Sequence, residues 1–297
     1  MSDTARTNAY RQAIRRLVRA GDVVLDVGAG TGILAFFACE AGARRVYAVE
    51  DDPTVAAAAA LLAKRVPGGD RVAVIRAHST KATLPEPADV LVTETLGPFG
   101  LDEGILRSVI DARRRLLRSG GVIIPARLAL SIAPVEAPDV FATAVGWWTE
   151  PHYGLDLSLV KSFAANTPAF ARFAETALLS DPAVVADVDF QTVERPALSA
   201  HVSFACRRDG VVHGFAGWFA ATLAPGLVLS NATPGATHWR HVFLPIEEPA
   251  VVRAGTRIGV TLELDERNGW RWHGRIEASP AVAFDQSTWF GAPVPPP

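Results

Sequence analysis

Two glutamates, Glu94 and Glu103, stand nine residues apart at the ends of a stretch rich in glycine and proline, TLGPFGLD. Two carboxylates that face one cavity repel each other unless a cation lies between them. A guanidinium would satisfy both, because it is planar, stays protonated and donates several N–H groups in a fork. A single loop glutamate is more often a helix cap or a solvated charge. If Glu94 and Glu103 face the same cavity, together they would form a binding site for a planar cation.

A second chemical feature is the segment VVLDVGAGTGIL, which carries Gly28, Gly30 and Gly32. Glycines on a turn between a strand and a helix let the backbone approach a ligand closely. The spacing G-x-G-x-G places the third glycine one residue early for NAD. Glu50 follows about 20 residues after the loop, where a carboxylate can accept hydrogen bonds from ribose hydroxyls. The combination favours S-adenosylmethionine over a nicotinamide, although a glycine turn alone can be purely structural.

The elements that would position these residues alternate between short apolar runs and longer helical patterns. Asp52 followed by Pro53 is a helix-start signal. Carboxyl ends of parallel strands are where open sheets place ligands, and Glu94 follows the fourth strand. The pattern predicts a parallel α/β sheet with strands at 23–27, 46–50, 72–76, 91–93 and 121–124 and helices at 33–41, 53–64 and 103–117.

After Pro125 the sequence alternates with period 2, as in RLALSIAPV, which is typical of antiparallel strands. Asp209-Gly210 and Asn268-Gly269 are tight hairpin signals. A broken helical pattern from 153 to 179 interrupts the strands. We therefore expect two domains, an α/β domain at residues 1–124 with a short N-terminal helix and a mostly antiparallel β domain at 125–297, which includes a helical arm at about 153–180.

Composition narrows the function classes. The formal net charge of −2 argues against a dedicated nucleic-acid binder. The arginines on the first helix are interpreted as the solvent-exposed face of that helix. Cys39 and Cys206 are too few for a disulfide scaffold or a thiolate zinc site, and the histidines form no ligand-spaced cluster. The N-terminus lacks a signal peptide's apolar core, and no stretch has the length of a membrane span. We expect a cytoplasmic protein with no metal, no membrane partner and no nucleic-acid partner.

In these motifs and their order the chain resembles the protein arginine N-methyltransferases. The resemblance covers VLDVGAGTGIL, VYAVE, TETLGPFGLDE, GGVIIPARLAL, WWTEPHYGLDLSLVK and ATHWRHVFL. It implies a Rossmann-like S-adenosylmethionine-dependent methyltransferase domain, a C-terminal β-barrel, and a helical arm that docks on a second subunit to make a homodimer. The activity implied is transfer of a methyl group to a guanidino nitrogen of arginine in a protein or peptide.

The resemblance also assigns roles to residues. Glu94 and Glu103 would grip the substrate guanidinium, His238 in the Thr-His-Trp loop would lie beside the active site, and Asp3 would pair with His238. Arg6 would hold the cofactor carboxylate. The full set of expected cofactor-binding residues is Arg6, Asp26, Gly28, Ala29, Gly30, Leu34, Glu50, Asp51, His78, Ser79 and Glu94.

The sequence also departs from the family pattern. Thr95 and Leu96 follow Glu94 where the family usually has Trp and Met, and His78-Ser79 stands where an acid often meets the adenine. Backbone groups or Ser79 would then serve the adenine. The short N-terminus suggests a bacterial-type member without the family's N-terminal lid helix. These departures leave two alternatives open: N-methylation of another amine, either a peptide N-terminal α-amine or a natural-product intermediate, and a non-catalytic dimeric scaffold.

Overall fold

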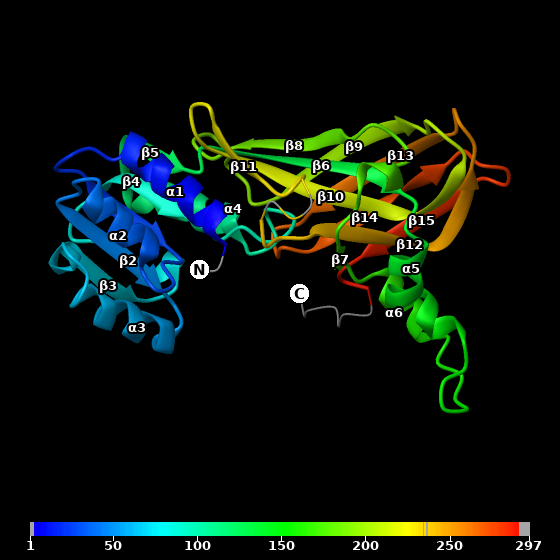
Figure 1. The fold of residues 1–297 in the computed structure, drawn as a ribbon, viewed down its shortest axis with the longest axis horizontal. Helices are drawn as coiled ribbons and strands as arrows, with labels where there is room; N and C mark the ends of the chain where they lie inside the picture. Colours follow the sequence, from blue (N-terminus) through cyan, green and yellow to red (C-terminus); the bar gives the residue numbers. More distant parts are fainter. Residues whose placement is uncertain (1–2, 234, 236, 291–297) are drawn as a thin grey trace. The chain divides into compact units, whose positions relative to one another are not determined.

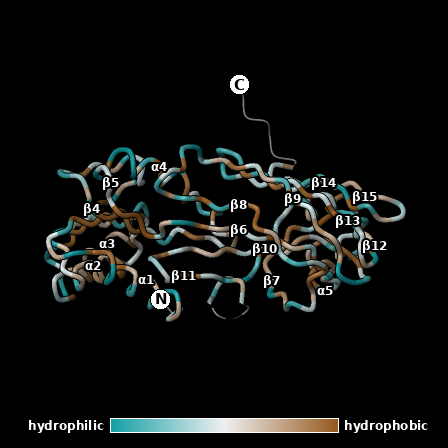
Figure 2. Tube along the Cα trace, turned by 90° about the horizontal axis from the view of Figure 1, so that it is seen from above, coloured by the Kyte–Doolittle hydropathy of each residue, from teal (hydrophilic) through white to brown (hydrophobic). Residues whose placement is uncertain are grey.

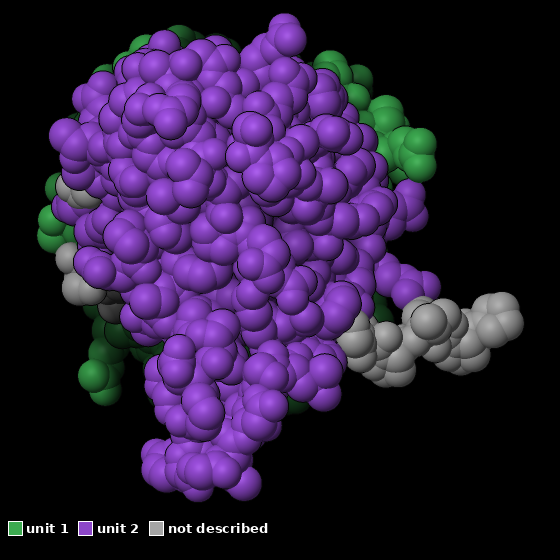
Figure 3. Space-filling model, turned by 90° about the vertical axis from the view of Figure 1, so that its right-hand side faces the viewer, with its two compact units in different colours: residues 1–128, 188–196, 220–230 green, residues 129–187, 197–219, 231–297 purple. Residues whose placement is uncertain are grey.

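The computed structural model describes residues 3–233, 235 and 237–290 (Figure 1). The chain forms two compact units, coloured separately in Figure 3. Unit 1 comprises residues 1–128, 188–196 and 220–230, and unit 2 comprises 129–187, 197–219 and 231–297. The boundary predicted after residue 124 thus lies near the end of the first segment of unit 1, which two later segments join. Within the described part of the chain, no helix has the length and apolar character needed to cross a membrane.

Unit 1 contains a parallel five-stranded sheet in the order β3-β2-β1-β4-β5. Every residue of the central strand β1 is buried, as expected where helices cover both faces of a parallel sheet. Figure 2 shows the same property as a brown trace along the strands around β4. The strands are β1 (Val23–Val27), β2 (Arg45–Glu50), β3 (Val72–Arg76), β4 (Ala88–Thr93) and β5 (Leu117–Ile124).

The helices of unit 1 are α1 (Thr4–Leu17), α2 (Ile33–Glu40), α3 (Pro53–Ala63) and α4 (Ile105–Arg115), with short 3₁₀ turns η1 (Gly69–Arg71) and η2 (Ser79–Lys81). The predicted start of α3 is confirmed: the Asp52 carboxylate accepts from the amides of Thr54 at 2.8 Å and Val55 at 2.9 Å. The last predicted helix begins two residues late, because Gly104 precedes it with φ of 75°. That left-handed backbone cannot continue a helix toward Glu103.

Two antiparallel sheets account for the β part, as the sequence predicts. One has the order β7-β12-β10-β6-β8 with β11 on β10, and the other has the order β15-β14-β13-β9. Trp272, Phe215 and Phe243 are fully buried between strands, and the Trp272 indole donates to the Pro245 carbonyl at 2.6 Å. The strands are β6 (Arg127–Val135), β7 (Ala169–Ala171), β8 (Ala183–Asp189), β9 (Leu198–Ala205), β10 (Gly210–Ala224), β11 (Leu227–Ser230), β12 (His241–Val252), β13 (Arg257–Leu264), β14 (Trp270–Ile276) and β15 (Val282–Ser287).

One of the two predicted hairpins is confirmed. Asn268 has φ of 68°, and the Asp265 amide donates to the Gly269 carbonyl at 3.0 Å, which closes the turn between β13 and β14. The hairpin predicted at Asp209-Gly210 is wrong. β9 pairs with β13 and β10 pairs with β12, so that turn carries the chain from one sheet to the other.

The helical interruption exists, but its predicted bounds are wrong. The helices here are α5 (Pro138–Ala144), η3 (Gly146–Thr149) and α6 (Val160–Ala165). The first two lie before residue 153, because Pro138 supplies a favourable first helical position. The later part of the expected arm returns to the sheet. Phe170 lies on β7, which pairs with β12, and Phe173 belongs to the core; a further 3₁₀ turn, η4, spans Glu175–Ala177.

Candidate active site

The turn between β1 and α2 is closed by its own hydrogen bonds. The amides of Gly28 and Ala29 both donate to the Val49 carbonyl at 3.0 Å, and the Gly30 amide donates to Glu50 Oε2 at 2.8 Å. These three N–H groups are therefore used inside the protein rather than directed at a ligand. Gly30 instead leaves unoccupied space beside the turn, because a Cβ built there would meet no atom within 4 Å. Its φ is 56°.

Glu50 ends β2 and is held over this turn. Its second oxygen, Oε1, accepts from the Asp52 amide at 3.0 Å. A carboxylate offers about four acceptor positions, so hydroxyl groups can still bind to Glu50. Its neighbour Asp51 is exposed at the same end of the sheet. The expected position of a ribose-binding acid is thus fixed by two backbone amides.

Asp26, on β1, is a buried carboxyl group that lacks an ordinary hydrogen bond. Its side chain is 0% exposed, and neither oxygen has a partner among the described residues. Burial raises its pKa to about 7; the Ala35 amide lowers the pKa in part, and the charges of Glu50 and Glu94 raise it further. The charges of Glu50 and Glu94 thus both reach Asp26 at this end of the sheet, which favours a ligand with positive charge.

Glu94 follows β4 directly and forms an ion pair with Arg6, whose Nη1 lies 2.7 Å from Glu94 Oε2. The Glu94 side chain is 20% exposed. Burial raises its pKa to about 7; Arg6 lowers the pKa, and the charges of Glu103 and Asp3 raise it. The structure thus brings Glu94 and Glu103 within electrostatic reach of each other. Glu103 is exposed, so the pair has one buried and one solvated carboxylate.

The loop between the two glutamates is folded around Asp102, a residue that the sequence analysis did not single out. Asp102 Oδ2 accepts from the Phe99 amide at 2.6 Å, and a Cβ on Gly97 would lie 2.6 Å from the Asp102 Cβ. Leu101, within the loop, is fully buried. Because Glu103 comes next, Asp102 fixes the return of the loop. An acid inside a Gly- and Pro-rich loop was the available signal.

Helix α1 is anchored to the end of β4. Asp3 caps the helix, with its Oδ1 accepting from the Arg6 amide at 2.9 Å. The buried Tyr10 hydroxyl donates to the Thr93 carbonyl at 2.9 Å, and burial raises its pKa well above the usual value. Nothing in the sequence pointed to this contact. The expected contact of Arg6 with a cofactor carboxylate stays a prediction.

Three further residues expected to bind the cofactor lie after β3 and on α2. The His78 ring Nδ1 lies 2.8 Å from Thr80 Oγ1, and the Ser79 hydroxyl donates to Ser108 Oγ at 3.3 Å. Ser79 is buried and His78 is exposed, while Leu34 is buried in the first turn of α2. The Ser79 hydroxyl thus faces α4, and the cofactor-binding roles of these residues stay predictions.

His238 belongs to unit 2. It is exposed, and its ring lies 4.4 Å from that of Trp239 at a 37° tilt. Trp239 is buried and packs edge-on against Phe219 at 5.1 Å. Asp3 belongs to unit 1, so the expected His238–Asp3 pair stays a prediction.

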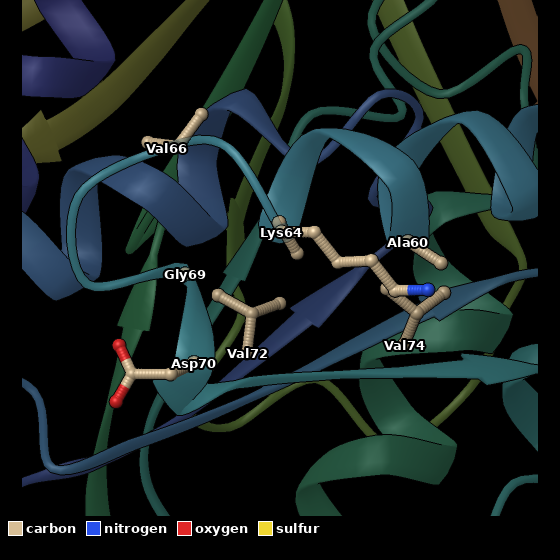
Figure 4. A pocket seen from close by; sticks show the side chains of 8 residues that line it. Ala60, Lys64, Val66, Gly69, Asp70, Val72 and Val74 are labelled. Carbon is tan, nitrogen blue, oxygen red and sulfur yellow. The ribbon is translucent and has the colours of Figure 1, made fainter.

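A cavity of about 570 Å³ lies elsewhere in unit 1, between α3 and the edge strand β3. Ala60, Val72 and Val74 give it apolar walls, and Figure 4 shows the Lys64 side chain extending along it toward Val74. None of the expected site residues lines this cavity. It is therefore separate from the cluster of acids at the carboxyl ends of the strands.

The acid cluster fits S-adenosylmethionine, which carries a sulfonium, an ammonium, a carboxylate and ribose hydroxyls. Glu50 can accept the hydroxyls, while Asp26 and Glu94 supply negative charge for the cationic groups. Within the ranges that the structure describes, no group of three or more His, Cys, Asp or Glu residues is arranged to hold a metal ion.

Comparisons with known proteins identify the family to which the chain is similar. Residues 126–280 match the family described as the arginine methyltransferase oligomerization subdomain, and residues 5–126 match ribosomal protein L11 methyltransferase (PrmA). Protein arginine N-methyltransferase 6 of Danio rerio is 36% identical over 273 residues, which is 87% of this chain and 78% of that protein. Protein arginine N-methyltransferase 2 of Xenopus tropicalis is 32% identical over 297 residues, 94% of this chain and 68% of that protein.

Solved structures give the same answer. One is a chain of the Trypanosoma brucei PRMT1 enzyme-prozyme heterotetrameric complex with AdoHcy, with a TM-score of 0.86 and 25% identity, covering 96% of this chain and 95% of that one. Another is Arabidopsis thaliana protein arginine methyltransferase 10, with a TM-score of 0.80 and 26% identity over 96% and 95% of the two chains. The chain belongs to the protein arginine N-methyltransferase family.

Proposed function

We propose that this protein transfers a methyl group from S-adenosylmethionine to a guanidino nitrogen of arginine in a peptide or protein. The observation that carries the proposal is the electrostatic coupling of Glu94 and Glu103 at the carboxyl end of β4, where Glu94 has its pKa raised to about 7. A buried carboxylate beside another acid gains most from a cation that binds both. The names of the curated relatives support arginine as the substrate.

The chemistry follows from the charges. A guanidinium has a pKa above about 12, so it arrives protonated and its nitrogen lone pair is delocalised. Glu94 and Glu103 would bind the N–H groups of two nitrogens, which concentrates positive charge there and frees the third nitrogen as a nucleophile. When bound, S-adenosylmethionine supplies a methyl group on a positively charged sulfur. Holding the nucleophile in line with that group provides much of the rate.

Glu103 is the carboxylate that would accept the proton released by the methylated nitrogen. The nitrogen that gains the methyl group becomes more acidic and must lose one proton. Glu103 is exposed, so a proton that it accepts can pass on to water. Glu94, which is four-fifths buried and paired with Arg6, is better suited to hold the substrate in place.

We also propose that two copies associate through the helical segment 138–165. Five large apolar side chains there are unusually accessible: Trp147 42%, Tyr153 95%, Leu155 59%, Leu159 81% and Phe163 47%. The match to an oligomerization subdomain supports an oligomer. Light scattering should report a dimer, and Leu159→Asp should shift it toward the monomer; a monomeric parent protein would contradict this proposal.

The test of the catalytic proposal compares Glu94→Gln and Glu103→Gln with the parent protein on an arginine-containing peptide. Both variants should bind S-adenosylhomocysteine in calorimetry and lose methyl transfer, whereas Glu40→Gln, an exposed acid on α2, should keep it. Full transfer by Glu94→Gln would refute the guanidinium clamp. Methylation confined to a peptide α-amine would point to the other-amine reading, and absence of cofactor binding in the parent would point to the scaffold.

A further inference from the structure

A second cavity, of about 320 Å³, lies in unit 2 and contains none of the expected active-site residues. Its walls come from Phe173 and Leu178 after β7, Trp218 on β10 and His241 at the start of β12, and Glu175 stands among the lining residues. This volume is at the low end of small-molecule sites, which span roughly 300–1,000 Å³. The cavity therefore suits an occupant of the size of a side chain.

The histidine in this cavity is held neutral by the backbone. His241 Nδ1 accepts from the Phe173 amide at 3.3 Å, and Nε2 then donates to the Asn231 carbonyl at 2.9 Å. The residue is 3% exposed, and burial lowers its pKa below the usual value. With both nitrogens occupied, His241 presents an uncharged aromatic ring that does not repel a cation.

Two aromatic rings, those of Phe173 and Trp218, lie beside His241. The Phe173 and His241 rings are nearly parallel, 6.0 Å apart at 16°, and the Trp218 ring lies 5.5 Å from His241 at 45°. Trp218 is only partly buried. Aromatic faces carry negative partial charge, and tryptophan attracts cations most strongly.

The charged residues near the cavity determine whether it favours a positively or a negatively charged ligand. Glu175 is exposed and is one of the residues that line the cavity. Arg172 is exposed and its charge is felt at His241, but it does not line the cavity. Arg240 lies over the Phe170 ring, 5.9 Å from its centre. A carboxylate beside aromatic walls is the arrangement that selects an organic cation over an anion.

We propose that the Phe173–Trp218–His241 cavity binds an organic cation with apolar substituents, such as an alkylguanidinium or a methylated ammonium group. Its source is either a free small molecule or a basic side chain of a peptide. Methyl groups on a guanidinium enlarge its apolar surface, so a methylated arginine side chain fits this chemistry. The site goes beyond the proposed methyl transfer, and its occupancy does not depend on Glu94.

The test is calorimetric titration of the full chain with tetramethylammonium and with N-methylguanidinium, using tert-butanol as the neutral counterpart. Both cations should bind saturably and the alcohol should not. Trp218→Leu should weaken binding about fivefold, the loss of roughly 1 kcal/mol of cation–π attraction. Glu175→Gln, an exposed isosteric change, should weaken it about threefold. Arg172→Gln should tighten it.

Two controls separate this site from the active site. Glu277→Gln, an exposed acid on the four-stranded sheet side of unit 2, should leave cation binding unchanged. Glu94→Gln should also leave it unchanged, even where methyl transfer is lost. An arginine peptide that competes with tetramethylammonium would identify a side-chain source, and lack of competition a free cation. Absence of saturable binding, equal binding of the alcohol, or binding unaltered by both Trp218→Leu and Glu175→Gln would overturn the proposal.

Discussion

Replacing Glu94 with glutamine should stabilise the folded protein at pH 8. In the folded state the pKa of Glu94 is about 7 in place of the usual 4.5, first because of burial. Between these two values the folded protein holds a proton that the unfolded chain has lost, so stability falls as the pH rises through this window. One pKa unit is worth about 1.4 kcal/mol, so ionised Glu94 costs about 3 kcal/mol at pH 8. Glutamine resembles the protonated form and avoids that cost.

The assay is urea unfolding of the parent and Glu94→Gln proteins at pH 5 and pH 8 without cofactor. The variant should gain little at pH 5 and about 3 kcal/mol at pH 8 relative to the parent. Glu40→Gln is the matched control with the opposite sign, because the hydrogen bond from Arg11 lowers the pKa of Glu40 and its removal should cost stability at pH 8. A Glu94→Gln protein that is no more stable than the parent at pH 8 would refute this reasoning.

Three further changes test the site. Arg6→Gln should raise the pKa of Glu94, because Arg6 lowers it, and should move the acidic limb of the kcat/KM profile to higher pH; an unmoved limb would show that Glu94 does not control it. Gly28→Ala should cost about 1–2 kcal/mol for its positive φ of 69° and more because its Cβ would lie 2.7 Å from the Thr95 methyl. Thermal unfolding should show partial rescue by Thr95→Ser, and the clash argument fails without it. Asp102→Ala should raise the KM for peptide while Asp102→Asn keeps most activity, since asparagine retains the hydrogen-bond acceptor; equal effects would contradict its positioning role.

Much of the α/β architecture follows from local patterns. The strand at 23–27 and the helix capped by Asp52 agree with the structure, because buried parallel strands read as apolar runs and an Asp-Pro pair marks a helix start. The hairpin at Asn268-Gly269 was equally readable. The turn at Asp209-Gly210 has the same chemistry, yet its flanking strands join different sheets. The pairing of these strands with partners distant in the sequence determines the path of the chain at Asp209-Gly210, and the dipeptide itself does not encode that pairing.

The site shows the same division. The positions of the glycine turn after β1, of Glu50 at the end of β2 and of Glu94 after β4 could be predicted, because local patterns set those strands. The roles of these residues stay predictions. The role of Tyr10 could not be predicted, since its hydrogen bond to the Thr93 carbonyl joins residues 83 positions apart. The raised pKa of Asp26 could not be predicted either, because it is caused mainly by the complete burial of this carboxyl group. Burial and long-range contacts are properties of the folded chain.

The guanidinium clamp is tested most directly by locating the transferred methyl group. A peptide with a free N-terminus, one arginine and one lysine would be incubated with S-adenosylmethionine and the parent protein, and fragmentation mass spectrometry would place the product. The two-carboxylate site predicts methylation at the arginine side chain alone, and none with Glu94→Gln. A methyl group on the α-amine or the lysine with the arginine untouched would contradict it.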